Sequence, residues 1–170
     1  KLFAFEHYDI VPDILVYGKG LGGGFPIGAL SSCKEKMELF REKPILGHIT
    51  TFGGHPVIAS AALANLKETL DSGIMKKINE KEKLIRKLLS HKLINEIRGR
   101  GLMLALIMKN SKTANQLVIK CIKKGLILFW LLFENKAVRI TPPLTISNKE
   151  IKLGCKIIIN TLNKLGKSVD

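Results

Sequence analysis

Residues 12–29 read Pro-Asp-Ile-Leu-Val-Tyr-Gly-Lys-Gly-Leu-Gly-Gly-Gly-Phe-Pro-Ile-Gly-Ala and place one lysine, Lys19, among glycines. The apolar run at 14–17, bounded by Pro12 and Gly18, is typical of a buried strand. Because glycine has no Cβ, the flanking positions permit backbone angles and close approaches that other residues do not. The pattern predicts open space around the Lys19 amine, which a lysine needs in order to form a covalent imine with a bulky planar aldehyde.

Two nucleotide-binding patterns compete for the same glycines. Gly18, Gly20 and Gly23 match the dinucleotide pattern G-x-G-x-x-G after a strand. That pattern must open a helix, and residues 25–28, Phe-Pro-Ile-Gly, are a poor helix start. A P-loop lysine comes last in its loop and precedes Ser or Thr, which Lys19 does not. An ordinary glycine turn with a solvated lysine is the remaining alternative.

Residues 12–29 resemble the lysine segment of the class III (omega-type) aminotransferases, whose lysine holds pyridoxal phosphate as a Schiff base. The resemblance implies that Lys19 is this catalytic and cofactor-binding lysine. It also implies that burial and nearby positive charge keep the freed amine largely neutral, so that it can move a proton between substrate and cofactor.

A second motif spans residues 47–56, Gly-His-Ile-Thr-Thr-Phe-Gly-Gly-His-Pro. Hydroxyls, glycine amides and a helix beginning at Pro56 together suit an anion. The segment resembles the family's loop before a helix, which implies that Thr51, with Thr50 beside it, binds the cofactor phosphate of the other subunit. For Thr50, a helix-capping hydroxyl remains the alternative. His55 stands where the family often has asparagine.

A third motif is Val-Arg-Ile-Thr-Pro-Pro-Leu at residues 138–144. The planar guanidinium of Arg139 matches a carboxylate, and the paired prolines stiffen the neighbouring backbone. The segment resembles the family's Arg-x-x-Pro-Pro-Leu stretch, which implies that Arg139 binds the substrate carboxylate. From the residues alone, an exposed arginine at a strand end is the simpler interpretation.

Composition and charge limit the partners of the chain. The net charge of +14 is compatible with nucleic-acid binding, but the lysines are scattered and few aromatics lie among them. We therefore expect a lysine-rich surface and no nucleic-acid partner. No apolar run is long enough for a membrane span, so we expect no membrane association. Three distant cysteines form neither a zinc pattern nor a disulfide framework, which favours inert thiols in the cytoplasm and no metal.

Several further elements are expected along the chain. A capping box at 32–35 predicts a helix at about 34–42, and a boundary is expected at 71–73. Beyond it, the patterns predict an amphipathic helix from Ile74, a turn at 96–101 feeding a strand, a helix at 113–123, strands at 126–132 and 137–140, and a helix capped by Ser147 and Glu150. Arg98 and Arg100 are interpreted as structural residues that hold neighbouring loops, with anion binding as the alternative.

The resemblance covers nearly the whole chain and implies an α/β protein, the C-terminal part of a fold type I pyridoxal-phosphate-dependent transferase. Residues 1–72 would be part of the large α/β domain, and residues 73–170 a small α+β domain. The chain begins with Lys1 and is interpreted as a piece of a longer protein, in which the aspartate for the cofactor ring nitrogen would precede it.

The implied activity is ping-pong transfer of an amino group from an amino acid or omega-amino compound to a 2-oxo acid. A homodimer with shared active sites is implied, because Thr51 would act across the interface. Alternatives remain: a sister reaction such as an aminomutase or decarboxylase, a non-catalytic or split-gene subunit that needs a separate N-terminal half, and a basic nucleic-acid-binding module.

Overall fold

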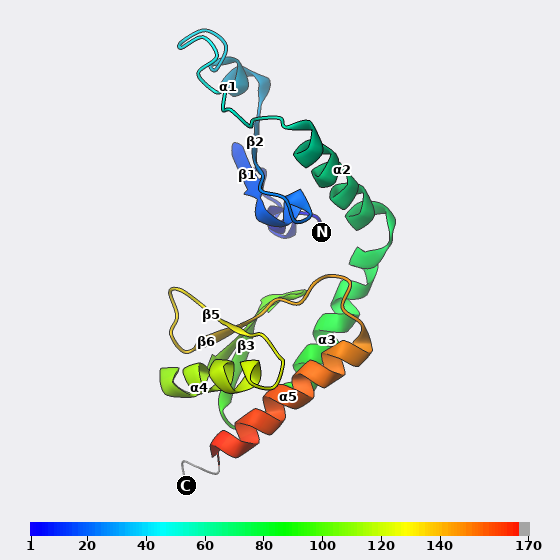
Figure 1. Cartoon of the computed structure of the whole chain (residues 1–170), viewed down its shortest axis with the longest axis vertical. Helices are drawn as coiled ribbons and strands as arrows, with labels where there is room; N and C mark the ends of the chain where they lie inside the picture. The colour runs from blue at the N-terminus through cyan, green and yellow to red at the C-terminus, as the bar shows by residue number, and fades with distance from the viewer. Residues whose placement is uncertain (167–170) are drawn as a thin grey trace. The chain divides into compact units, whose positions relative to one another are not determined.

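The computed structural model describes residues 1–166, which form two compact units (Figure 1). Unit 1 comprises residues 1–75 and unit 2 begins at residue 76. The boundary expected at residues 72 and 73 lies close to this division. The interpretation of the two units as parts of a large and a small domain stays a prediction.

Unit 1 contains a two-stranded antiparallel sheet and one long helix. Its elements are η1 (Ala4–His7), β1 (Ile14–Gly18), η2 (Lys19–Gly22), β2 (Gly28–Ser32), α1 (Lys34–Glu38) and α2 (Pro56–Asp71), and η3 (Ile74–Lys77) spans the division. β1 pairs with β2 in a register that sets Gly18 opposite Gly28. An added Cβ on Gly18 would lie 2.6 Å from the carbonyl oxygen of Ile27, so this close approach requires glycine.

The burial expected for the first strand is not found. Ile14 is 55% exposed and Val16 is 74% exposed, although both lie in β1 as expected from the apolar run. Among the described residues, Ala62 alone is a buried apolar side chain of unit 1. The apolar residues of β1 and β2 therefore form a strand pair without a covering layer inside this unit.

The expected capping box at 32–35 is wrong. The Ser32 hydroxyl donates to the backbone oxygen of Asp13 at 2.7 Å, so it does not cap the helix. Cys33 is the N-cap residue of α1 and makes no side-chain cap. α1 ends at Glu38 rather than near residue 42.

Unit 2 is a four-stranded antiparallel sheet with helices. Its elements are α3 (Ile78–Leu88), β3 (Ile94–Arg100), β4 (Met103–Met108), α4 (Ser111–Ile122), β5 (Phe129–Trp130), β6 (Ala137–Ile140) and α5 (Asn148–Gly166). The strand order is β3-β4-β6-β5. The helices and β6 match the expectation within a few residues. The strand expected at 126–132 is reduced to β5. The turn expected at 96–101 is confined to residues 101 and 102, where it leads into β4, and the residues before it form β3.

The core of unit 2 lies between the helices and one face of the sheet. Leu106 of β4, Leu117 of α4, Val138 of β6 and Leu162 of α5 are all fully buried. Because side chains alternate along a strand, Arg139 projects from the face opposite to Val138 and is exposed.

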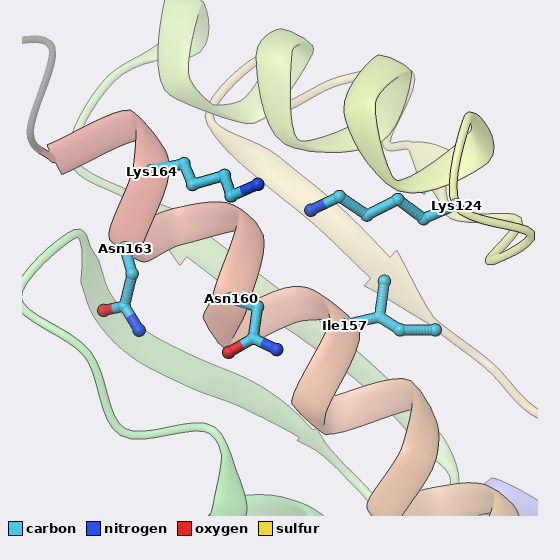
Figure 2. Close-up of a pocket in the computed structure, with 5 residues that line it drawn as sticks. All are labelled: Lys124, Ile157, Asn160, Asn163 and Lys164. Carbon is cyan, nitrogen blue, oxygen red and sulfur yellow. The ribbon is translucent and has the colours of Figure 1, made fainter.

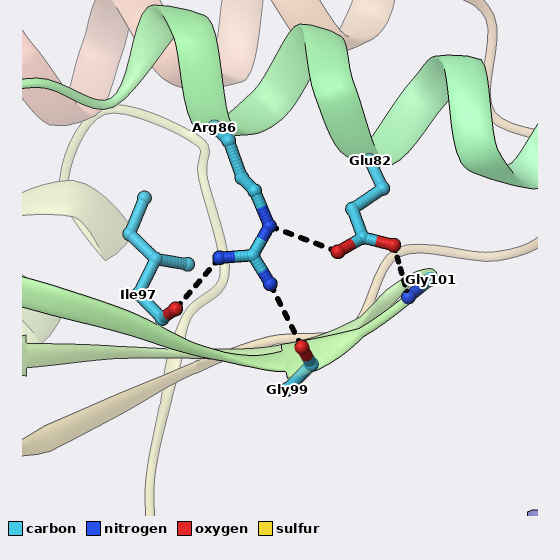
Figure 3. Close-up of polar contacts among 5 residues, drawn as sticks. All are labelled: Glu82, Arg86, Ile97, Gly99 and Gly101. Atoms are coloured by element: carbon cyan, nitrogen blue, oxygen red, sulfur yellow. Dashed lines mark hydrogen bonds and ion pairs between the residues drawn. The ribbon is translucent and has the colours of Figure 1, made fainter.

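The hairpin of β3 and β4 is fastened to α3 by one charged pair (Figure 3). The Arg86 guanidinium donates to the carbonyl oxygens of Ile97 at 2.6 Å and Gly99 at 2.7 Å, and to Glu82 at 2.8 Å. The second carboxylate oxygen of Glu82 accepts from the Gly101 amide at 2.6 Å. The bonds to backbone carbonyls show why this glycine-rich segment is an ordered strand.

Arg98 was expected to hold neighbouring loops, and its hydrogen-bond partner is Glu96 in the same strand. Arg98 donates to Glu96 at 2.6 Å on the exposed side of β3. This hydrogen bond raises the pKa of Arg98. The two side chains form a local surface pair.

The cap expected for the last helix is confirmed. The Ser147 hydroxyl accepts from the Glu150 amide at 3.2 Å, and the Glu150 carboxylate accepts from the Ser147 amide at 2.8 Å. This reciprocal pair satisfies two backbone donors at the start of α5. The hydrogen bond from the Ser147 hydroxyl lowers the pKa of Glu150.

Candidate active site

Lys19 lies where β1 meets η2, directly after Gly18. It adopts a left-handed backbone conformation with φ 48°, which is uncommon for a residue with a side chain and costs of order 1 kcal/mol. The side chain is exposed, and an added Cβ on Gly20 would meet no atom within 4 Å. The open space expected around the amine is present, whereas the described residues do not bury it.

The turn that holds Lys19 is fastened to α2 by Asn65. The Asn65 amide nitrogen donates to the carbonyl oxygens of Gly20 at 2.7 Å and Leu21 at 3.3 Å. Gly23 follows with φ 58°, and an added Cβ there would lie 3.1 Å from the Asn65 Cβ. Asn65 thus supports the strained lysine turn, and the sequence interpretation did not include it.

Thr50 and Thr51 lie in the exposed loop before α2. The Thr50 carbonyl oxygen accepts from the Gly53 amide at 3.1 Å, which closes a turn around Thr51. α2 begins at Pro56 with His55 as its N-cap residue, and no side chain caps it. The amides of its first turn therefore remain available to an anion, as does the exposed Thr51 hydroxyl.

His55 shows one unusual feature. Its Nδ1 atom is buried and has no hydrogen-bond partner within the described residues. The ring lies 6.5 Å from the Phe52 ring between centroids, in a tilted arrangement. The residue packs at the helix start, beside the loop that contains both threonines.

Arg139 lies in β6 of unit 2, opposite Ala105 of β4 and Phe129 of β5. Its guanidinium carbon lies 4.9 Å from the centre of the Phe129 ring. None of the ion pairs found within residues 1–166 involves Arg139. Its positive charge is thus exposed and available to a carboxylate.

The loop after Arg139 is held by a buried lysine. Lys81 of α3 is 7% exposed, and its ammonium donates to the carbonyl oxygen of Leu144 at 2.6 Å. This bond fixes the end of the Pro142-Pro143-Leu144 segment to α3. Lys81 is a second supporting residue that the sequence interpretation did not include.

The structure thus distributes the predicted residues over both units. Lys19, Thr50 and Thr51 lie in unit 1, whereas Arg139 lies in unit 2. Within residues 1–166 no group of three or more His, Cys, Asp or Glu side chains could hold a metal ion. Of the cysteines, Cys33 is exposed, whereas Cys121 and Cys155 are buried.

A separate hollow of about 400 Å³ lies between α5 and the end of α4 (Figure 2). Figure 2 shows the side chains of Lys124 and Lys164 extending toward one another across it. The Lys124 ammonium donates to the Thr161 hydroxyl, and both lysines lie near helix C-termini, where positive charge is favourable. No residue predicted for the active site lines this hollow.

In the part of the chain that the structure describes, no helix combines the length and the apolar character needed to cross a membrane.

The known proteins that this chain resembles are aminotransferases. The aminotransferase class-III family matches residues 1–162. An acetylornithine aminotransferase of Caldanaerobacter subterraneus subsp. tengcongensis is 36% identical over 170 residues, which are 97% of this chain and 42% of the relative. A putrescine aminotransferase of Pectobacterium atrosepticum is 34% identical over 172 residues, which cover 97% of this chain and 36% of the relative.

Solved structures agree with these relatives. The crystal structure of acetylornithine aminotransferase from Elizabethkingia anophelis gives a TM-score of 0.84 at 30% identity, over 96% of this chain and 44% of that one. An ornithine aminotransferase from Toxoplasma gondii, described as having partial occupancy of PLP at its active site, gives a TM-score of 0.86 at 28% identity. The match covers 99% of this chain and 40% of that one. These neighbours confirm the predicted fold, a fragment of a fold type I transferase.

The chain spans only about two fifths of the length of these curated relatives. The family match at residues 1–162 includes the lysine turn, the threonine loop and the strand of Arg139. The chain belongs to the class III aminotransferases, a family of pyridoxal-phosphate-dependent enzymes.

Proposed function

We propose that this chain forms the C-terminal portion of an aminotransferase that transfers an amino group from an amino acid or omega-amino compound to a 2-oxo acid. The strained, exposed Lys19 at the end of β1 is the observation on which the proposal mainly rests. The acetylornithine and putrescine aminotransferases among the relatives support a donor with two nitrogen-bearing ends.

Pyridoxal phosphate fits the residues that are present. Lys19 offers an unhindered amine, and the loop of Thr51 offers a hydroxyl and free amides for a phosphate. When bound, the cofactor supplies an aldehyde for covalent attachment of amines and a ring that withdraws electrons. Arg139 would orient the substrate by its carboxylate, and Thr51 would act across a two-fold interface of a homodimer.

In this reaction Lys19 has two roles. Its Nζ atom would hold the cofactor between turnovers, and the freed amine would carry a proton between the substrate carbon and the cofactor as a general base and acid. A base must be neutral to accept a proton, which requires shelter from solvent. The described residues leave Lys19 exposed, so the shelter belongs to the rest of the assembled enzyme in this proposal.

Borohydride reduction of the chain mixed with pyridoxal phosphate, followed by peptide mapping, tests the lysine assignment. We expect Lys19 to be labelled above the other exposed lysines, such as Lys34, and Lys19→Gln to remove that label alone. Because the chain supplies few cofactor contacts, we also expect weak cofactor binding and little turnover. Labelling of other lysines without Lys19 would contradict the assignment.

A second candidate is a non-catalytic subunit that is completed by a separate polypeptide. The exposed apolar side chains of β1, including Val16 at 74%, favour a surface that another chain covers. Mixing the chain with a polypeptide that supplies the remaining part of the fold distinguishes the two. Restored activity on mixing supports the subunit, and product analysis separates a transaminase from an aminomutase or decarboxylase.

A further inference from the structure

We propose that Phe129 is a positioning residue for Arg139, and that its ring holds the guanidinium so that the N–H edge faces a substrate carboxylate. The inference rests on the proposed role of Arg139 in carboxylate binding. In this proposal Phe129 determines how tightly Arg139 binds the carboxylate.

The contact is direct and is set by the strand register. Phe129 and Arg139 are cross-strand partners in the pairing of β5 with β6, so their side chains project from the same face of the sheet. The guanidinium carbon lies 4.9 Å from the ring centre, which is within the range of a cation–π interaction. Trp130 packs against the edge of Phe129 with ring centres 5.8 Å apart.

The other side of Arg139 is occupied by a small residue. Its partner on β4 is Ala105, whose side chain is a single methyl group, and the next residue in the row is Arg98 of β3. Arg98 is already bonded to Glu96. Arg139 therefore differs from Arg98 in two respects, because it stacks on an aromatic ring and makes no ion pair within residues 1–166.

Stacking and carboxylate binding use different parts of the guanidinium. A ring that stacks on a guanidinium covers its flat face, whereas a carboxylate accepts hydrogen bonds from the N–H groups in the plane. A long side chain loses rotamer freedom when it binds a ligand, and a side chain that is already restrained loses less. Removal of the ring should weaken carboxylate binding by about two- to tenfold.

The test follows the Nε–H resonance of Arg139 by nuclear magnetic resonance in the 170-residue chain. Sodium acetate replaces sodium chloride at constant ionic strength, so that general charge screening does not change. We expect a saturable shift of the Arg139 signal with little change at Arg98, which serves as the internal control. Phe129→Leu should raise the acetate dissociation constant, and Phe129→Tyr should restore the original value.

A purely structural role for Phe129 would lower stability without changing this affinity. Trp130 is the single tryptophan of the chain and touches Phe129, so folding of each variant is judged by a cooperative change of its fluorescence on addition of denaturant rather than by the starting signal. If Phe129→Leu does not fold, Phe129→Ile provides a β-branched replacement that suits a strand.

The two hypotheses fail in different ways. Equal acetate affinity for the leucine and tyrosine variants would overturn the positioning role and leave carboxylate binding by Arg139 in place. An Arg139 signal that responds to acetate no more than Arg98 does would overturn both.

Discussion

At the scale of single residues, Lys19 depends on a helix far along the chain. Its left-handed backbone lies in a turn whose carbonyl oxygens accept hydrogen bonds from Asn65, 45 positions beyond Gly20. Strained residues persist where the surrounding structure holds them in place. The hydrogen bonds from Asn65 therefore hold the lysine turn against α2, and the turn should become more mobile when Asn65 is replaced.

Asn65→Ala tests this dependence. Loss of two hydrogen bonds should cost about 1 kcal/mol locally and speed hydrogen exchange of the Gly23 and Phe25 amides about fivefold or more. Exchange measured by nuclear magnetic resonance gives the result. Asn160→Ala, an exposed position on α5, is the matched control. Unchanged exchange at Gly23 would show that the turn is stable without Asn65.

Gly154 offers the opposite effect, a gain in stability. It lies in the interior of α5, and an added Cβ would make an ordinary contact of 3.6 Å with Leu126. Because glycine is more flexible in the unfolded chain, Gly154→Ala should raise the free energy of unfolding by about 0.5–1 kcal/mol. Denaturant unfolding followed at Trp130 measures this, and a loss of stability would mean that the helix packs more tightly there.

The main site residues could be proposed from sequence, but their supporting residues could not. Lys19, Thr51 and Arg139 occur in short motifs with a chemical reason for each residue type. Only after the chain folds does Asn65 bond the turn that follows Lys19 and Phe129 contact Arg139, and neither residue lies in a recognisable pattern. Their contacts depend on helix packing and strand register, which a linear sequence does not specify.

At the scale of elements, the start of α5 couples stability to pH. The hydrogen bond from Ser147 lowers the pKa of Glu150. A carboxyl group with a lowered folded pKa stabilises the fold above its unfolded pKa, and this contribution is lost as the pH falls through the folded value. Ser147→Ala should cost about 1 kcal/mol near neutral pH and progressively less in acid. Unfolding measured across the acidic range checks this, and a cost independent of pH would contradict it.

The charged pair that holds the β3–β4 hairpin should contribute more than an exposed ion pair. Arg86 and Glu82 bond three backbone groups of that hairpin between them while remaining partly buried. Arg86→Met removes the guanidinium bonds to the Ile97 and Gly99 carbonyls and leaves Glu82 with the Gly101 amide as its remaining partner, at an expected cost of about 1–3 kcal/mol. Thermal unfolding measures the loss. Arg98→Met, on the exposed face, should change stability by less than about 1 kcal/mol.

Some elements followed from local pattern and others did not. The Ser147 box was predicted correctly because its partners are three residues apart. The box at Ser32 failed because its hydroxyl bonds the backbone of Asp13 in the neighbouring strand segment instead. The glycines at 99 and 101 suggested a turn; residues 101 and 102 do form one, whereas Gly99 pairs with β4 as part of β3 and its carbonyl oxygen accepts from Arg86.

At the scale of the whole molecule, the two units differ in how deeply they bury their cysteine side chains. Cys33 of unit 1 is exposed, whereas Cys121 and Cys155 lie inside unit 2. Burial raises the pKa of Cys155 to about 11 and also raises that of Cys121. Since the thiolate is the reactive form, iodoacetamide should modify Cys33 alone in the native chain. Peptide mapping before and after denaturation tests this, and early labelling of Cys155 would indicate an open core.

The overall architecture was predictable because the family motifs occur in order along the chain. The thin core of unit 1 was not, because an apolar run indicates a strand without indicating what covers it. Val16 satisfies the pattern of a buried strand and is nevertheless 74% exposed.

Gly99 shows how one backbone position restricts which sequences can adopt this fold. It has φ 105°, and an added Cβ would lie 2.1 Å from the carbonyl oxygen of Met103 on the neighbouring strand. Every other amino acid would collide there. In a library with all substitutions at this codon, selection for soluble expression should retain almost only glycine, whereas Gly154 should accept alanine readily.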